Sequence, residues 1–141
     1  MNKQHPLNIR MIDHIVIRTN ALQEMVAFYR DVLNCPIERQ PDGLGLIQMR
    51  AGQSLIDLVD INGPLGGKEH ELPERAASNM DHFCIQIDPW DLNSITSHLN
   101  ECGIKFDDVA TRYGALGTGP SIYIKDPEGN TVELKGRPTD K

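Results

Sequence analysis

The sequence has no long apolar run and no cluster of basic residues. No stretch reaches the length of a membrane span, so we expect no membrane partner. The formal net charge is −6. Binding to nucleic acid needs a patch of Lys and Arg to neutralise phosphates, so the sequence argues against that class as well. A small molecule is the partner that the composition leaves open.

The sequence has few cysteines, and their spacing matches neither a thiolate zinc site nor a disulfide framework. The three cysteines, Cys35, Cys84 and Cys102, include no Cys-x-x-Cys pair, which argues against a thiolate zinc site. Their odd number and irregular spacing fit a reducing compartment better than a disulfide framework. The first residues are polar and show no apolar signal region. We therefore expect a cytoplasmic protein.

A phrase that contains histidine occurs twice in the 141 residues. Asp13-His14-Ile15 in the first half matches Asp81-His82-Phe83 in the second half, with an offset of 82 − 14 = 68. A second pair of phrases places Asp57 and Glu133 at matched positions, with an offset of 133 − 57 = 76. Each half thus has one His on an early strand and one carboxylate on a late strand. The sequence predicts a duplicated unit.

Both halves show the same order of predicted elements. In the first half, β-branched residues predict a strand over 11–18, and apolar residues at spacings of three and four predict a helix over 21–33 with Asn20 as its N-cap. In the second half, Asp88-Pro89 opens a helix over 90–101. The remaining predicted strands are 36–40, 44–50, 54–61, 81–88, 104–109, 120–125 and 131–136.

These elements predict one α+β domain made of two tandem β-α-β-β-β modules. The expected divisions are an N-terminal extension (1–10), the first module (11–61), a Gly- and Pro-rich linker (62–80), the second module (81–136) and a C-terminal tail (137–141).

Two imidazoles and two carboxylates at duplicated positions can converge on one metal ion. Neutral imidazole and carboxylate oxygen suit a divalent metal ion such as Zn, Ni, Mn or Fe(II), and leave open positions for water and substrate. The alternative for a single His is an ordinary half-buried strand residue. The duplication favours the metal interpretation for His14, His82 and Glu133. Asp57 is equally compatible with a metal ligand, a base beside the metal and a surface acid.

The sequence resembles the vicinal oxygen chelate superfamily, which includes glyoxalase I, fosfomycin- and bleomycin-resistance proteins, methylmalonyl-CoA epimerase and extradiol dioxygenases. The matching phrases include Asp13-His14-Ile15-Val16-Ile17, Ala27-Phe28-Tyr29-Arg30-Asp31-Val32-Leu33 and Asp81-His82-Phe83. The most specific one is Ile122-Tyr123-Ile124-Lys125-Asp126-Pro127-Glu128-Gly129-Asn130-Thr131-Val132-Glu133-Leu134. The resemblance implies that the two modules form a curved mixed-sheet cup around a divalent metal.

By this resemblance, His14, His82 and Glu133 match the superfamily's metal ligands on the first, fifth and eighth strands. Asp57 falls where glyoxalase I has a fourth ligand, a Glu, and Asp is one methylene shorter. The resemblance also implies a homodimer, in which His14 and Asp57 of one chain share a site with His82 and Glu133 of the other.

Three further side chains are expected in the cup from strand parity and position. Arg18 either binds an anionic substrate group or is a strand-end surface charge. Gln86 is a hydrogen-bond candidate for substrate. Tyr123 either donates a hydrogen bond to a substrate oxygen or fills the cup wall. The segment 112–119 is interpreted as a loop that serves either as a lid or as a plain hairpin connection.

Several chemistries are compatible with this set. A glyoxalase-type lyase or isomerase needs a carboxylate near the metal to move a proton from carbon, and Asp57 could provide it. An Fe(II) extradiol dioxygenase would, by resemblance, have a catalytic His before the Tyr123 strand, where this chain has Gly114-Ala115-Leu116-Gly117. A fosfomycin-type transferase would have a Thr where Val16 stands. The sequence favours the glyoxalase type, with a metal-free binding or resistance protein as the non-enzymatic alternative.

Overall fold

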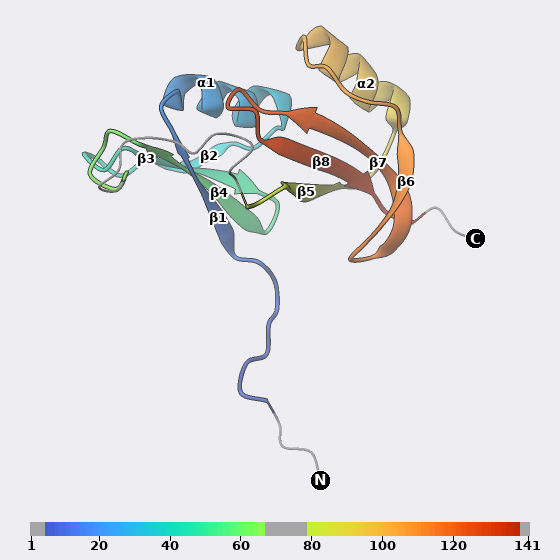
Figure 1. Ribbon diagram of the computed structural model, residues 1–141, viewed down its shortest axis with the longest axis horizontal. Helices are drawn as coiled ribbons and strands as arrows, with labels where there is room; N and C mark the ends of the chain where they lie inside the picture. Colours follow the sequence, from blue (N-terminus) through green and yellow to red (C-terminus); the bar gives the residue numbers. More distant parts are fainter. Residues whose placement is uncertain (1–4, 67–78, 139–141) are drawn as a thin grey trace.

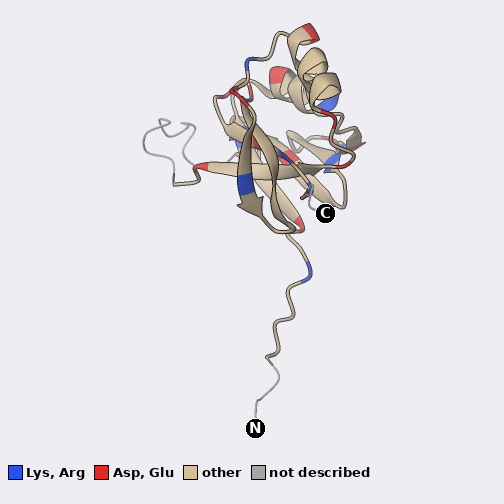
Figure 2. Ribbon diagram, turned by 90° about the vertical axis from the view of Figure 1, so that its right-hand side faces the viewer, with Lys and Arg blue, Asp and Glu red and all other residues tan. Residues whose placement is uncertain are grey.

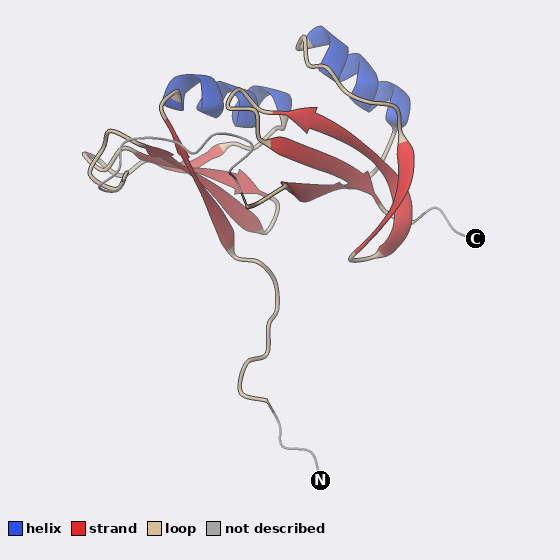
Figure 3. Cartoon of the chain, viewed as in Figure 1, coloured by secondary structure: helices blue, strands red, loops and turns tan. Residues whose placement is uncertain are grey.

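The computed structural model describes residues 5–66 and 79–138. Two four-stranded sheets lie next to each other, and the helices cover the same side of both (Figures 1 and 3). The first module consists of β1 (His14–Thr19), α1 (Leu22–Ala27), the π-helical turn η1 (Phe28–Val32), β2 (Ile37–Arg39), β3 (Leu46–Ala51) and β4 (Ser54–Asp60). The second consists of β5 (His82–Ile87), α2 (Leu92–Glu101), β6 (Ala110–Gly114), β7 (Gly117–Lys125) and β8 (Thr131–Gly136).

The two sheets have the same topology. The strand order is β1-β4-β3-β2 in one and β5-β8-β7-β6 in the other. In each sheet the first strand of the module pairs parallel with the last, and the other pairs are antiparallel. The α+β class and the repeated β-α-β-β-β order are therefore confirmed. The strands β6 and β7 bend strongly, which gives the second sheet its curvature (Figure 1).

Alternation along the strands separates a core face from an open face. Side chains two apart point to the same side. On β4 and β8 the residues next to the carboxylates are apolar and buried, among them Leu58 and Val132, which are fully inaccessible to solvent. They pack with Met25 and Tyr29 from the helical segment above the sheets. Asp57 and Glu133 therefore point to the face that the helices do not cover.

Polar contacts tie the two modules together above the core. The buried Tyr29 hydroxyl donates to Asp126 Oδ2 at 2.7 Å. The Thr19 hydroxyl donates to Glu128 in the same β7–β8 turn. His98 Nε2 lies 2.8 Å from the carbonyl oxygen of Val32. The first two contacts fix the β7–β8 turn against the first module, and the third joins α2 to η1.

Three local expectations are wrong. The predicted strand over 104–109 is irregular, and β6 begins only at Ala110. The reason is that Asp107 Oδ1 accepts the Tyr123 backbone N–H at 2.7 Å, the group that a strand partner would otherwise bind. The helix of the first module has Ala21 as its N-cap residue, and the Thr19 hydroxyl accepts the Ala21 N–H in place of an Asn20 cap.

The helix of the second module starts later than Asp88-Pro89. It begins at Leu92, and Asp91 caps it by accepting the Ser94 N–H at 3.3 Å. The expected linker 62–80, extension 1–10 and tail 137–141 fall partly outside the described residues, which omit 1–4, 67–78 and 139–141. No helix in the described ranges is long and apolar enough to cross a membrane. Basic and acidic residues are mixed along the ribbon (Figure 2).

Candidate functional site

Asp57 lies on the open face of the first sheet, and hydrogen bonds from neighbouring side chains fix its orientation. The carboxylate is buried, with 6% exposure. Gln48 on the neighbouring strand donates its amide Nε2 to both carboxylate oxygens, each at 3.1 Å. Arg39 on β2 donates to Gln48 Oε1 at 3.0 Å, which fixes the amide orientation. Asp57 is therefore oriented by its neighbours across three strands.

His14 lies on the parallel strand β1, on the same face as Asp57. Its Nδ1 is 2.7 Å from Asp13 Oδ1, which leaves Nε2 directed elsewhere. The Asp13 hydrogen bond raises the pKa of the His14 imidazole, and the charge of Asp57 acts in the same direction. A carboxylate that holds one ring nitrogen of a His is the usual support for metal ligation through the other.

The second sheet repeats the arrangement with a direct contact. His82 Nδ1 is 2.7 Å from Asp81 Oδ2. Its Nε2 is 3.1 Å from Glu133 Oε1 on the parallel strand β8. Glu133 is buried to the same degree as Asp57. One imidazole nitrogen and one carboxylate oxygen thus face each other on the open side of the second sheet.

Tyr123 is packed into this second half-site. Its ring lies edge-on to the His82 ring, with centroids 5.3 Å apart. The Arg112 guanidinium lies over the other side of the ring, 4.3 Å from its centroid. Arg112 also donates to the Ser121 hydroxyl at 2.6 Å. Tyr123 is therefore held rigidly next to His82 and Glu133, which is compatible with both roles expected for it.

Gln48 is a residue that sequence reasoning missed. It pairs with Asp57 across β3 and β4, as Tyr123 pairs with Glu133 across β7 and β8. The offset from Gln48 to Tyr123 is 123 − 48 = 75, close to the offset of 76 between the carboxylates. Extending the duplication from the carboxylates to the next strand would have identified it.

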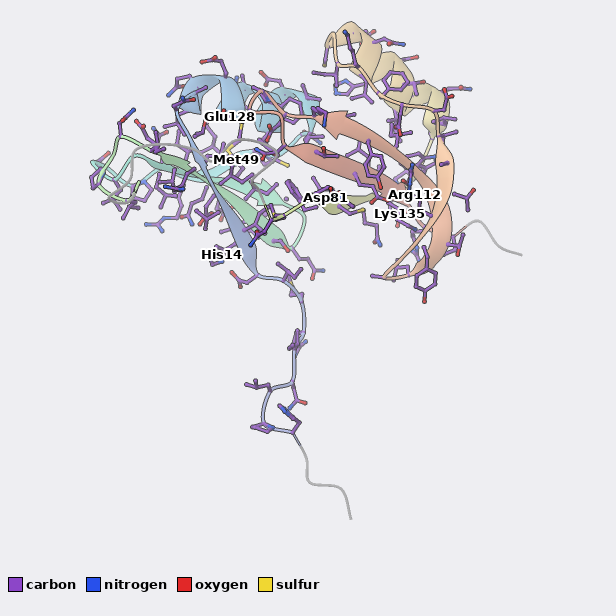
Figure 4. The ribbon with its side chains drawn as sticks, viewed as in Figure 1. His14, Met49, Asp81, Arg112, Glu128 and Lys135 are labelled. Atoms are coloured by element: carbon purple, nitrogen blue, oxygen red, sulfur yellow. The ribbon has the colours of Figure 1, made fainter. Side chains whose placement is uncertain are left out.

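The four donors form two separate pairs in one chain. Among residues 5–66 and 79–138, no group of three or more His, Cys, Asp or Glu side chains is close enough to hold a metal ion. Figure 4 shows His14 at the start of β1, well apart from Lys135 and Arg112 on the second sheet. Each module presents one His and one carboxylate, so a single chain offers two half-sites.

Arg18 and the segment 112–119 have structural contacts. Arg18 Nη1 donates to the carbonyl oxygen of Gly66, 3.2 Å away, just after the first module. The segment 112–119 is largely strand, because β6 and β7 pair up to Gly114 and Gly117. The expectation of a loop over 112–119 is therefore wrong for most of the segment, and only residues 115–116 connect the two paired strands of the hairpin.

A cavity of about 190 Å³ opens between this hairpin and the open face of the second sheet. Gln86 lines it, as does Cys84. The cavity is further lined by Tyr113, Gly114, Ala115, Leu116, Glu133 and Lys135. Burial, reinforced by the charge of Glu133, raises the pKa of the Cys84 thiol to about 11, so the thiolate is scarce at neutral pH.

A larger cavity of about 600 Å³ lies between the 103–107 segment and β7. It shares Tyr123 and Thr131 with the open face but contains none of the four candidate metal ligands. The smaller cavity is the one that Glu133 enters, so it is the better candidate for substrate.

Comparison with known proteins gives a consistent picture. The model of the Glyoxalase/Bleomycin resistance protein/Dioxygenase superfamily matches residues 11–134. The chain is 27% identical over 139 residues to the glyoxalase domain-containing protein RDO1 of Mycosarcoma maydis, covering 94% of this chain and 71% of that protein. It is 26% identical over 137 residues to the mitochondrial methylmalonyl-CoA epimerase of Bos taurus, covering 91% and 75%.

A solved structure agrees with the fold. The crystal structure of lactoylglutathione lyase from Agrobacterium tumefaciens superimposes with a TM-score of 0.65 at 23% identity, covering 92% of this chain and 95% of that one. At this level of sequence identity, the structural similarity is evidence for the fold alone.

Proposed function

The chain belongs to the Glyoxalase/Bleomycin resistance protein/Dioxygenase superfamily, and from this premise we propose that it is a divalent-metal-dependent lyase or isomerase of the glyoxalase type. Its substrate is an oxygen-rich small molecule. The observation that supports this proposal is the contact of His82 Nε2 with Glu133 Oε1. In the first module His14 and Asp57 lie on the same face, and the charge of Asp57 acts on the His14 imidazole without a direct contact. Imidazole and carboxylate in this combination suit Zn, Ni, Mn or Fe(II).

The proposal includes a homodimer. Because one chain presents the four residues as two separated pairs, a site that contains all four needs the first module of one chain opposite the second module of its partner. A twofold axis would then generate two equal sites. His14 and Asp57 would come from one chain and His82 and Glu133 from the other.

The residues around each half-site have distinct tasks in this proposal. The divalent ion, when bound, acts as a Lewis acid for two neighbouring substrate oxygens. Asp57 takes a proton from the carbon next to these oxygens, while the Gln48 amide keeps its carboxylate aimed at the cup. Tyr123 donates a hydrogen bond to a substrate oxygen. Gln86 and Arg18 remain candidates for substrate contacts.

An extradiol-type dioxygenase with Fe(II) is the second candidate. The register favours it at one point, since Tyr123 and Glu133 are directly paired neighbours across β7 and β8. The residues Gly114 to Gly117, which form the hairpin tip, provide no imidazole for the base of that reaction. The glyoxalase type needs no additional residue, so it is the better match.

The metal content of the purified protein tests the proposal. We expect about one ion per chain in the wild type, since a twofold dimer has two equal sites. His82→Ala should weaken metal binding by at least about 100-fold, because even loss of a group that merely orients a ligand costs 10–100-fold. His5→Ala, in the exposed segment ahead of β1, is the matched control and should retain the metal. A wild-type protein that binds no divalent ion would identify a metal-free binding protein instead.

A further inference from the structure

Lys135 is a buried cation on the open face of the second sheet. It lies two residues beyond Glu133 on β8, so the two side chains point to the same side. Only 6% of the residue is exposed. Its Nζ donates to the carbonyl oxygens of Gly117, at 2.9 Å, and Gly136, at 3.4 Å. Within the described ranges no carboxylate lies in ion-pair distance of Nζ, so its direct partners are carbonyl dipoles, with the Glu133 carboxylate two residues away on the same face.

A buried charge without a partner ion is costly and needs a reason. Comparison of the two modules shows that the fold does not require a charged residue at this position. The counterpart of Lys135 in the first module is Val59, again 76 positions earlier (135 − 59), and Val59 is buried on β4 without difficulty. Ser121, the cross-strand neighbour of Lys135, likewise replaces Leu46. The second module has a polar pair where the first has an apolar one.

Lys135 lines the cavity of about 190 Å³ on the open face of the second sheet. Gln86, its register partner on β5, lines the same cavity and is exposed to it. Gly114 leaves room for the lysine, because a Cβ at this position would be 2.9 Å from Lys135 Cε. Two other cations of this face are already engaged, Arg112 by Ser121 and Asp107 and Lys125 by the Thr131 hydroxyl. Lys135 is therefore the cation that can meet a ligand in this cavity.

We propose that this cavity binds a carboxylate of the substrate through Lys135 and Gln86, at a fixed distance from the oxygens held near Glu133. This inference rests on the proposed function, which places the reacting oxygens at the His82–Glu133 end. Residues two apart on a strand are separated by about 6.5–7 Å. The substrate class is thus a small molecule with neighbouring oxygens at one end and a carboxylate three or four carbons away.

The charge of the cavity favours a carboxylate over a phosphate. One ammonium group balances a single negative charge, and the buried Glu133 carboxylate next to it opposes a dianion. The hairpin side chains Tyr113 and Leu116 provide an apolar wall for the connecting carbons. A carboxylate can take one hydrogen bond from Nζ and one from the Gln86 amide.

Two probes that differ only in the distal carboxylate test the proposal. 2-Oxoglutarate has neighbouring oxygens at one end and a carboxylate at the other, whereas 2-oxopentanoate has a methyl group there. We expect calorimetric titration of the dimer to show at least ~10-fold tighter binding of 2-oxoglutarate, the usual worth of a hydrogen bond to a charged group. Lys135→Met should abolish this preference and leave the affinity for 2-oxopentanoate unchanged.

A second variant tests the same site without removing the lysine charge. Gly114→Ala should displace the lysine side chain and reduce the preference while the protein retains its ammonium group. Equal binding of the two probes by the wild type, or an equal loss of both in Lys135→Met, would overturn the proposal.

Performing the titrations with and without Mn²⁺ separates the two claims. If Mn²⁺ tightens neither probe, the proposed metal function fails, and the preference measured without metal still decides the carboxylate site.

Discussion

His82 and Glu133 face each other across β5 and β8, with Nε2 3.1 Å from Oε1. Their counterparts in the first module make no such contact, since Asp57 is one methylene shorter than Glu and is bound by Gln48 instead. We therefore propose different tasks for the two carboxylates, with Glu133 as a metal ligand and Asp57, which Gln48 binds, as a base.

Asp57→Asn should separate these tasks. We expect the variant to retain most of its metal affinity and to lose about 10²- to 10⁴-fold in the rate of proton removal, the usual contribution of a positioned base. Exchange of the C3 protons of 2-oxopentanoate with D₂O, followed by NMR on the metal-loaded protein, measures that rate without knowledge of the natural substrate. If metal binding is abolished, Asp57 is a ligand; if neither property changes, the pseudo-twofold argument fails at this position.

Tyr29→Phe should destabilise the fold by about 1–2 kcal/mol, the net value of a buried hydrogen bond plus part of the cost of an unsatisfied acceptor. The Tyr29 hydroxyl is the contact of the first module with Asp126, which also accepts the Asn130 amide. Denaturant unfolding measures the change. Tyr113→Phe, which removes an exposed hydroxyl, is the matched control and should leave the free energy of unfolding unchanged.

The stability of the wild type should fall at high pH because of the same tyrosine. Burial raises the pKa of the Tyr29 phenol far above its usual value, with the Asp126 charge adding to the effect. Above pH 10 the unfolded chain releases this proton and the folded chain retains it. The free energy of unfolding therefore declines, by up to ~1.4 kcal/mol per pH unit from this group.

Tyr29→Phe provides the reference for this decline. Cys35, whose pKa is raised to about 11 by burial, contributes a decline of the same sign in both proteins. The difference between the two unfolding profiles isolates the tyrosine. Parallel profiles above pH 10 would show that the phenol ionises as easily in the folded protein as in the unfolded one.

Metal affinity should depend on Asp13. The Asp13 hydrogen bond raises the pKa of His14, and a metal ligand must lose its proton before it binds. Proton competition in the wild type therefore begins at a higher pH than for a free imidazole. Asp13→Asn should shift the pH profile of metal affinity to lower pH, as measured by competition with a chromophoric chelator. Asp108→Asn is the control, and an unshifted profile for Asp13→Asn would contradict the assignment.

The sequence predicted the duplicated β-α-β-β-β order because apolar periodicity and repeated phrases are local signals. It failed over 104–109, where the Asp107 side chain takes the Tyr123 N–H that a strand would have used. It also missed Gln48, because the duplication was followed to the carboxylates but not to the neighbouring strand, where Gln48 pairs with Asp57. Register and the capping contact of Thr19 depend on the fold as a whole, so no local pattern reveals them.

The separation of the donor pairs was likewise beyond local patterns. The phrases around His14 and His82 predicted one His and one carboxylate in each module, and the resemblance predicted that the pairs of two chains meet. How far apart the two pairs lie within one chain depends on how the modules pack through contacts such as Tyr29 with Asp126.

The most direct test of the shared metal site mixes two inactive chains. His14→Ala and His82→Ala homodimers should each lose the metal. After joint unfolding and refolding, half of the dimers would contain one chain of each kind. In a shared arrangement, each mixed dimer has one site with both histidines intact and one with neither, so metal uptake should recover to about a quarter of the wild-type value. No recovery above the separate variants would contradict a site made from two chains.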